Sequence, residues 1–203
     1  CGIGKELFWK GLLGPGFTGA NSIEMADWDP SPYFENSKES RRADRCEQFA
    51  LAAAGEAMTQ AGDLPYNRER IGTILGTGIG GLRTLEGQVE VRMEKGERRV
   101  SPFLVPMMMS NASGAAISMR YGLQGPTETV CTACAASTHA IGNAARLIAW
   151  GRCDAVVTGG TESAATVTAL AGFTNMTAIS STFVSKPFDE TRDGFIQGEG
   201  AAI

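Results

Sequence analysis

The sequence predicts an α/β fold in which a mixed, mostly parallel β-sheet carries helices on both faces. Apolar, β-rich runs that predict strands occur near Ile71, Val130, Val156 and Ala201. Longer stretches with apolar residues at helical spacing lie between these runs, and this alternation is typical of a sheet covered on both faces. The 26 glycines of the 203-residue chain fall at turns and helix ends, as in an ordered protein, and form no low-complexity run.

The first part of the chain predicts two helices and one strand. An amphipathic helix is expected over residues 5–13, and a turn-rich surface segment that includes Asp29-Pro30-Ser31-Pro32 follows to residue 39. The alanine-rich stretch 42–60 predicts a helix that can pack close to a sheet. Residues 70–76 predict a buried strand that leads into a glycine-rich segment.

The rest of the chain alternates between helices and strands. Three methionines precede an amphipathic helix that reaches about residue 121, and residues 122–126 turn into what we expect to be the central strand. That strand is predicted to be buried just before Cys134, with a helix over 135–150 after it. A buried strand at 154–160 is expected to end in a Gly-Gly turn before Glu162, and a helical stretch then runs to residue 172.

Composition excludes several classes of protein. The net charge of −4 argues against a general nucleic-acid binder, and no apolar run approaches the roughly 18 residues of a membrane span. Five cysteines, an odd number, in a chain without a signal-peptide pattern indicate a reducing compartment, so we expect a cytoplasmic protein with free thiols. A hydrophobic content of 43% suffices for a sizeable core.

Cys134 stands where the strand run gives way to the helical pattern, at a predicted strand-to-helix turn. A side chain on such a bend lies beside the free N–H groups of the first helical turn, whose partial positive charge favours a thiolate over a thiol. The neighbours Ala133, Ala135 and Ala136 are small enough for a substrate carbonyl to approach the sulfur. These features indicate a nucleophile, and a buried structural cysteine is the alternative that the local sequence leaves open.

Two residues near Cys134 allow rival interpretations. Cys131 and Cys134 form a C-x-x-C pair, which is a poor metal site without a second pair or clustered histidines but fits a thiol oxidoreductase. His139 is the only histidine, yet it lies five residues along the helix, so its side chain points about 140° away from that of Cys134. We therefore expect His139 to be structural and not part of a Cys/His dyad.

The segment Gly76-x-Gly78-x-x-Gly81 has the spacing of a dinucleotide-binding fingerprint. That fingerprint also needs an acidic residue at the end of a second strand about 20 residues further on. Residues 90–99 form instead a charged, helix-like stretch that ends in a loop. A Rossmann fold is therefore disfavoured.

Four stretches of the chain together resemble the β-ketoacyl-acyl-carrier-protein synthases, the condensing enzymes of fatty-acid and polyketide synthesis. In chain order they are Gly76-Thr77-Gly78-Ile79-Gly80-Gly81, Thr132-Ala133-Cys134-Ala135-Ala136-Ser137, residues 154–162, and residues 186–195 with Gly198-Glu199-Gly200. The chain resembles most closely the discrete, elongating type II synthases. This resemblance implies a thiolase-like fold, in which two similar halves stack into five αβαβα layers and residues 1–203 form the N-terminal half.

The resemblance implies a decarboxylating Claisen condensation. Cys134 would take an acyl group from acyl-carrier protein as a thioester, and malonyl-acyl-carrier protein would then lose carbon dioxide to give the carbanion that attacks this thioester. The backbone N–H of Cys134 would be one oxyanion donor. No metal ion and no organic cofactor are implied, because the phosphopantetheine arm arrives on the substrate.

Further site residues follow from the resemblance alone. Ile79 matches the far wall of the acyl pocket, Leu104 a dimer-interface residue that reaches into the partner's acyl pocket, and Phe173 a residue that packs on the acyl chain. The carrier protein of this family is acidic, and the basic residues that match its docking patch are Lys38, Arg41, Arg42, Arg98 and Arg99. We expect a homodimer that receives acyl-carrier protein there; a solvated helix end is the alternative for the basic cluster.

The ends of the sequence depart from the family pattern. No strand precedes the first helix, and the two catalytic histidines, the supporting lysine and one oxyanion-hole loop of the family's second half have no match in these residues. We therefore expect a domain cut at both ends that is inactive by itself. Asp189, Arg192 and Glu199 match scaffold positions. The alternative to a synthase is a non-catalytic partner of the chain-length-factor kind, and the presence of Cys134 argues against it.

Overall fold

A four-stranded sheet organises the larger of two structural units. The computed structural model describes residues 2–203. Asp27–Ala164 and Gly200–Ile203 form the larger unit, and the residues up to Ala26 together with Ala165–Glu199 form the smaller one. Every helix of the described residues is too short or too polar to cross a membrane.

The strands of the larger unit are arranged in the order β2-β1-β3-β4. Their bounds are β1 (Ile71–Gly76), β2 (Thr127–Val130), β3 (Ala155–Glu162) and β4 (Gly200–Ala202). β1 pairs in parallel with both β2 and β3, and β3 pairs antiparallel with β4. Gly76 at the end of β1 lies opposite Val130 and Gly160, so the three parallel strands present their carboxyl ends at one edge of the sheet. The predicted mixed, mostly parallel sheet is confirmed.

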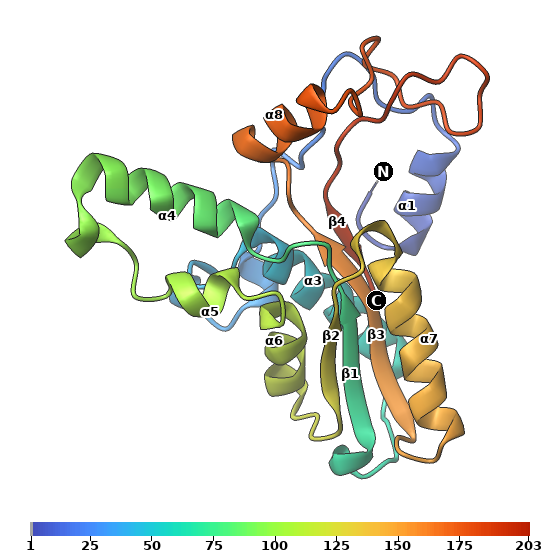
Figure 1. The fold of residues 1–203 in the computed structure, drawn as a ribbon. Helices are drawn as coiled ribbons and strands as arrows, with labels where there is room; N and C mark the ends of the chain where they lie inside the picture. The colour runs from blue at the N-terminus through green and yellow to red at the C-terminus, as the bar shows by residue number, and fades with distance from the viewer. Residues whose placement is uncertain (1) are drawn as a thin grey trace. The chain divides into compact units, whose positions relative to one another are not determined.

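Helices cover both faces of this sheet (Figure 1). α3 (Arg45–Ala61) and α6 (Ala112–Tyr121) pack on one face, and α7 (Ala136–Ala149) packs on the other. The core under α3 and α6 includes Ile71 and Leu75 of β1, whereas Ile74 of the same strand packs on α7. Because successive strand residues point to opposite faces, all six residues of β1 are buried, as the sequence predicts.

Short helices and α4 complete the larger unit. They are the 3-10 turns Ser31–Tyr33, Arg68–Arg70, Glu97–Arg99 and Ala133–Ala135, with α2 (Ser37–Ser40), α4 (Leu82–Lys95) and α5 (Leu104–Met108). α3 begins later than the predicted residue 42 because Asp44 caps it, accepting a hydrogen bond from Cys46 N at 3.0 Å. The other carboxylate oxygen of Asp44 accepts from Thr84 N and Oγ1, at 3.0 and 2.5 Å. One buried carboxylate thereby joins α3 to α4.

The smaller unit contains α1 (Lys5–Leu12) and α8 (Val167–Asn175). α1 lies where the sequence predicts a helix, and none of its residues is buried. Asp193 accepts hydrogen bonds from Ser180 Oγ at 2.7 Å, Ser181 Oγ at 2.8 Å and the N–H of Ser181 at 2.9 Å. These bonds, that from Ser180 first, hold the pKa of Asp193 well below its usual range.

Three secondary-structure predictions are wrong in detail. β2 is an edge strand and not the buried central strand; among residues 2–203 it pairs with β1 alone, and its first residues Thr127 and Glu128 are exposed. Gly159 and Gly160 continue β3 and form no turn, because they pair with Leu75 and Gly76 of β1, and pairing with β4 extends the strand to Glu162. α8 continues to Asn175, beyond the predicted end at residue 172.

Candidate active site

Cys134 lies in the middle of the 3-10 turn Ala133–Ala135, which links β2 to α7. Its thiol is free and exposed. Ala133 has a φ of 51°, a left-handed conformation that residues with a Cβ seldom adopt, so the chain bends sharply here. The structure thus places Cys134 on a strand-to-helix turn, as the sequence predicts.

Backbone-to-backbone packing holds this turn in place. A Cβ on Gly76, the last residue of β1, would overlap the carbonyl carbon of Ala136 and the nitrogen of Ser137. A Cβ on Gly160 in β3 would overlap Ser137 Oγ. The first turn of α7 therefore lies directly on the carboxyl ends of β1 and β3, where only glycine leaves enough room. This contact fixes the position of Cys134 relative to the carboxyl ends of these strands.

The loop after β1 lies next to the same edge. Thr77 N donates to Val130 O at 3.1 Å, and Gly80 N donates to Thr77 Oγ1 at 3.2 Å. A Cβ on Gly81 would overlap the carbonyl oxygen of Met107 in α5. Gly81 therefore allows close packing between the loop and α5.

Glu162, the last residue of β3, accepts hydrogen bonds from the backbone N–H groups of this loop. Its Oε2 accepts from Gly78 N at 2.5 Å and from Ile79 N at 3.2 Å. In a dinucleotide-binding loop such N–H groups face a phosphate, whereas here they face a carboxylate of the same chain. The sequence places Glu162 after a strand but does not predict this contact; a carboxylate one strand away from a Gly-x-Gly loop is the signal that could have found it.

Three observations near Cys134 bear on the rival interpretations. The His139 ring Nδ1 lies 2.8 Å from Thr132 Oγ1, a structural contact within the turn and the helix. Cys131 is exposed and free like Cys134, so both thiols of the C-x-x-C pair are accessible. Within residues 2–203, no group of three or more His, Cys, Asp or Glu side chains is placed to hold a metal ion.

Two other described cysteines differ from this pair. Cys46 and Cys153 are buried, and burial raises the pKa of both thiols. The nearby Asp44 carboxylate adds to the effect at Cys46. Raised thiol pKa values disfavour the reactive thiolate, so Cys46 and Cys153 are structural cysteines.

The three expected acyl-pocket residues lie on separate elements. Ile79 follows the Gly-Thr-Gly turn with 48% of its surface exposed, and Leu104 is the first residue of α5 and half-buried. Both belong to the larger unit, as does Cys134. Phe173 belongs to α8 of the smaller unit, where its half-buried ring meets that of Phe195 edge-on at 5.3 Å.

The basic residues expected to receive a partner are exposed. Lys38 lies in α2, Arg41 and Arg42 follow it directly, and Arg98 and Arg99 lie in the 3-10 turn after α4. The guanidinium of Arg42 stacks on the ring of Phe103, 4.1 Å from its centroid.

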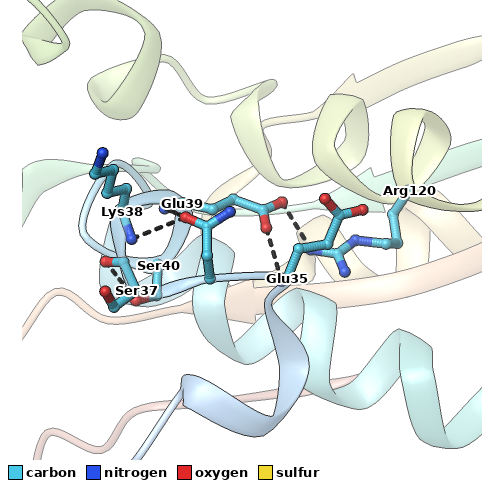
Figure 2. Close-up of polar contacts among 7 residues, drawn as sticks. Glu35, Ser37, Lys38, Glu39, Ser40 and Arg120 are labelled. Atoms are coloured by element: carbon cyan, nitrogen blue, oxygen red, sulfur yellow. Dashed lines mark hydrogen bonds and ion pairs between the residues drawn. The ribbon is translucent and has the colours of Figure 1, made fainter.

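Figure 2 shows that the acidic residue of α2 is already paired. Glu39 binds Arg120 at 2.7 Å and also accepts from Glu35 N, whereas the Lys38 side chain extends away from this pair. Asn36 caps α2 by accepting from the N–H groups of Lys38 and Glu39, at 3.0 Å each. Glu39 is therefore paired with Arg120 and not with Lys38.

Comparisons with known proteins show which family the chain belongs to. Residues 15–203 match the family model of the β-ketoacyl synthase N-terminal domain. The chain is 40% identical to a 3-oxoacyl-[acyl-carrier-protein] synthase 2 of Synechocystis sp., over 99% of this chain and 53% of the relative. It is 44% identical to the synthase of the same name in Staphylococcus aureus, over 83% of this chain and 43% of the relative.

A solved structure shows the same fold. The ishigamide ketosynthase/chain length factor superposes with a TM-score of 0.80 at 26% identity, over 88% of this chain and 45% of that one. The chain spans about half the length of the curated relatives that it matches. On the match of residues 15–203 and the identity to these relatives, the chain belongs to the family of β-ketoacyl synthase N-terminal domains.

Proposed function

We propose that the protein to which this domain belongs is an elongating 3-oxoacyl-acyl-carrier-protein synthase, acting in fatty-acid or polyketide synthesis in the reducing cytoplasm. The observation that carries this proposal is the exposed thiol of Cys134 on a sharp turn. Close packing of α7 on the sheet holds this turn at the edge where the parallel strands have their carboxyl ends. A rigidly held nucleophile at such an edge suits acyl transfer. The names of the relatives add the substrate class.

In the proposed reaction, the Cys134 thiolate attacks the thioester carbonyl of acyl-carrier protein. The carbonyl carbon forms a bond to the sulfur, and the phosphopantetheine thiol leaves with a proton. Malonyl-carrier protein then loses carbon dioxide, and its carbanion displaces the Cys134 thiolate to give the 3-oxoacyl product. The backbone N–H of Cys134 is proposed as one oxyanion donor.

We propose the exposed cations as the docking patch for the acidic carrier protein. The patch consists of Lys38, Arg41, Arg42, Arg98 and Arg99. Exposed charges of one sign raise the rate of encounter with an oppositely charged partner and do so less at high salt. The synthase is further proposed to act as a homodimer in which Leu104 of one protomer lies at the interface, with Ile79 and Phe173 lining the acyl site.

The test uses the full-length protein with acyl-carrier protein loaded with a short acyl group. Mass spectrometry should find the added acyl mass on Cys134, and Cys134→Ala should abolish it. Cys131→Ala is the matched control, since this cysteine is equally exposed and three residues away; it should still load. An intact protein that takes up no acyl group would indicate the chain-length-factor alternative. A disulfide between Cys131 and Cys134 that turns over with a dithiol substrate would indicate a thiol oxidoreductase.

A further inference from the structure

The side chain of Glu162 contacts a loop that is distant in the sequence, and its position at the end of β3 does not by itself explain this contact. Its side chain reaches from the end of β3 to the loop after β1, 84 residues earlier in the chain. There Oε2 accepts from the N–H groups of Gly78 and Ile79, and Thr77 Oγ1 lies 3.3 Å from the same oxygen. Because three donors of one loop converge on this single oxygen, Glu162 holds the loop firmly.

The Ile79 backbone is held on its other side as well. Ser110 Oγ donates to the carbonyl oxygen of Ile79 at 2.9 Å. The peptide groups before and after the Cα of Ile79 are therefore both fixed, whereas its side chain is 48% exposed. The rotation of the side chain is the freedom that remains at this position.

Two details show that the contact restricts the sequence and leaves a polar atom unpaired. A Cβ on Gly78 would lie 2.7 Å from Glu162 Oε2, so only glycine lets the carboxylate approach. The second oxygen, Oε1, is buried and has no hydrogen-bond partner among the described residues. A buried acceptor without a partner destabilises a protein and calls for an explanation beyond stability.

We infer that Glu162 is a positioning residue for Ile79, and that it sets the length of acyl chain that the site accepts. The inference rests on the proposed function, in which Ile79 lines the far end of the acyl site. With its backbone fixed by Glu162 and Ser110, Ile79 can only turn its side chain when a longer acyl group arrives. Without the hydrogen bonds to Glu162, the backbone of Ile79 can move together with its side chain when a long acyl group enters. Discrimination against long acyl chains then weakens.

The experiment measures how fast Cys134 of the full-length protein takes up acyl groups of four to fourteen carbons from thioesters, by intact-protein mass spectrometry. Glu162→Met removes the acceptor at similar side-chain length, and Glu162→Gln keeps one acceptor oxygen. We expect Glu162→Met to raise the ratio of long-chain to short-chain rates about tenfold, and Glu162→Gln to restore a near-parental ratio. Ser110→Ala, which leaves the carboxylate in place, should shift the ratio in the same direction.

Two controls separate positioning from stability. Asp154→Asn removes a carboxylate just before the other end of β3, where it binds Arg70 at 2.6 Å, and should leave the ratio unchanged. In an Ile79→Ala background, adding Glu162→Met should no longer change the ratio, because the residue through which it acts is gone. Amide hydrogen exchange should show faster exchange at Gly78 and Ile79 in Glu162→Met only.

The outcomes distinguish this inference from the proposed function. If the parent protein loads no acyl group on Cys134, the proposed function is refuted, and so is the inference about acyl-chain length that rests on it. If the parent loads but Glu162→Met slows all chain lengths equally, or shifts the ratio equally in the Ile79→Ala background, the inference alone is overturned.

Discussion

Gly76→Ala tests most directly how the fold holds Cys134. The added Cβ would lie 2.5 Å from the carbonyl oxygen of Ala136 and closer still to two other backbone atoms of α7, whereas ordinary contact begins at 3.4 Å. Because backbone atoms cannot rotate away, the first turn of α7 must move by about 1 Å. Overpacking of this kind typically costs about 1–3 kcal/mol of the free energy of unfolding.

The same displacement should reach the thiol. Cys134 precedes Ala136 by two residues, and misplacing a reacting group by about 1 Å can lower a rate about 100-fold. We expect Gly76→Ala to combine this loss of acylation rate with the loss of stability. Urea unfolding and acyl transfer to Cys134 in the full-length protein measure the two effects.

Two further glycines provide the comparison. Gly87 in α4 has no heavy atom within 4 Å of an added Cβ, so Gly87→Ala should leave the rate unchanged and stabilise by about 0.5–1 kcal/mol. The Cβ added by Gly160→Ala meets chiefly the side chain of Ser137, so adding Ser137→Gly should recover much of the stability that Gly160→Ala loses. The same addition should not rescue Gly76→Ala, whose Cβ meets backbone atoms. A Gly76→Ala protein with parental stability and acylation rate would refute the packing argument.

Three other predictions concern the acyl site, the docking patch and the pH dependence of stability. Ile79→Phe should exclude long acyl chains at a cost of roughly 1–3 kcal/mol in kcat/KM while sparing short ones, and Ile79→Ala should do the reverse; a change that is uniform along a primer series would remove Ile79 from the site. Replacing Arg41 and Arg42 by Glu should raise KM for acyl-carrier protein but not for acyl-coenzyme A, and equal losses on both would indicate a damaged fold. Burial raises the pKa of Glu47 to about 7 from an ordinary value of 4.5, so this group makes the protein lose stability as pH rises from about 4.5 to 7. Glu47→Gln should abolish that slope in urea titrations and stabilise at pH 8 by about 2–3 kcal/mol, and an unchanged slope would contradict this reading.

Local patterns in the sequence were enough to predict several elements. The apolar run at Ile71 predicts the buried strand β1, and helical spacing after Cys134 predicts α7, because each pattern records which side of one element is buried. The turn at Cys134 lies where these two kinds of pattern meet. The family followed from short motifs, since close packing and chemistry restrict the residue types allowed there.

The same patterns misjudged the context of individual strands. β2 was expected in the centre of the sheet and lies at its edge, and β3 continues through two glycines that predict a turn. Periodicity shows that a segment is a strand but does not name its neighbours. Pairing of both glycines with β1, and of Gly160 with β4, overrides the local preference of Gly159 and Gly160 for a turn.

Residue patterns alone were enough to predict the α/β class, the nucleophile candidate and the family of this protein. Two findings needed the folded structure: Gly76 and Gly160 must be glycines because α7 begins on top of them, and Glu162 holds the loop that carries Ile79. These contacts join residues 23 to 84 positions apart, and which distant segments meet depends on strand order and helix packing. A single sequence records the residue types that such contacts require but not the partners that require them.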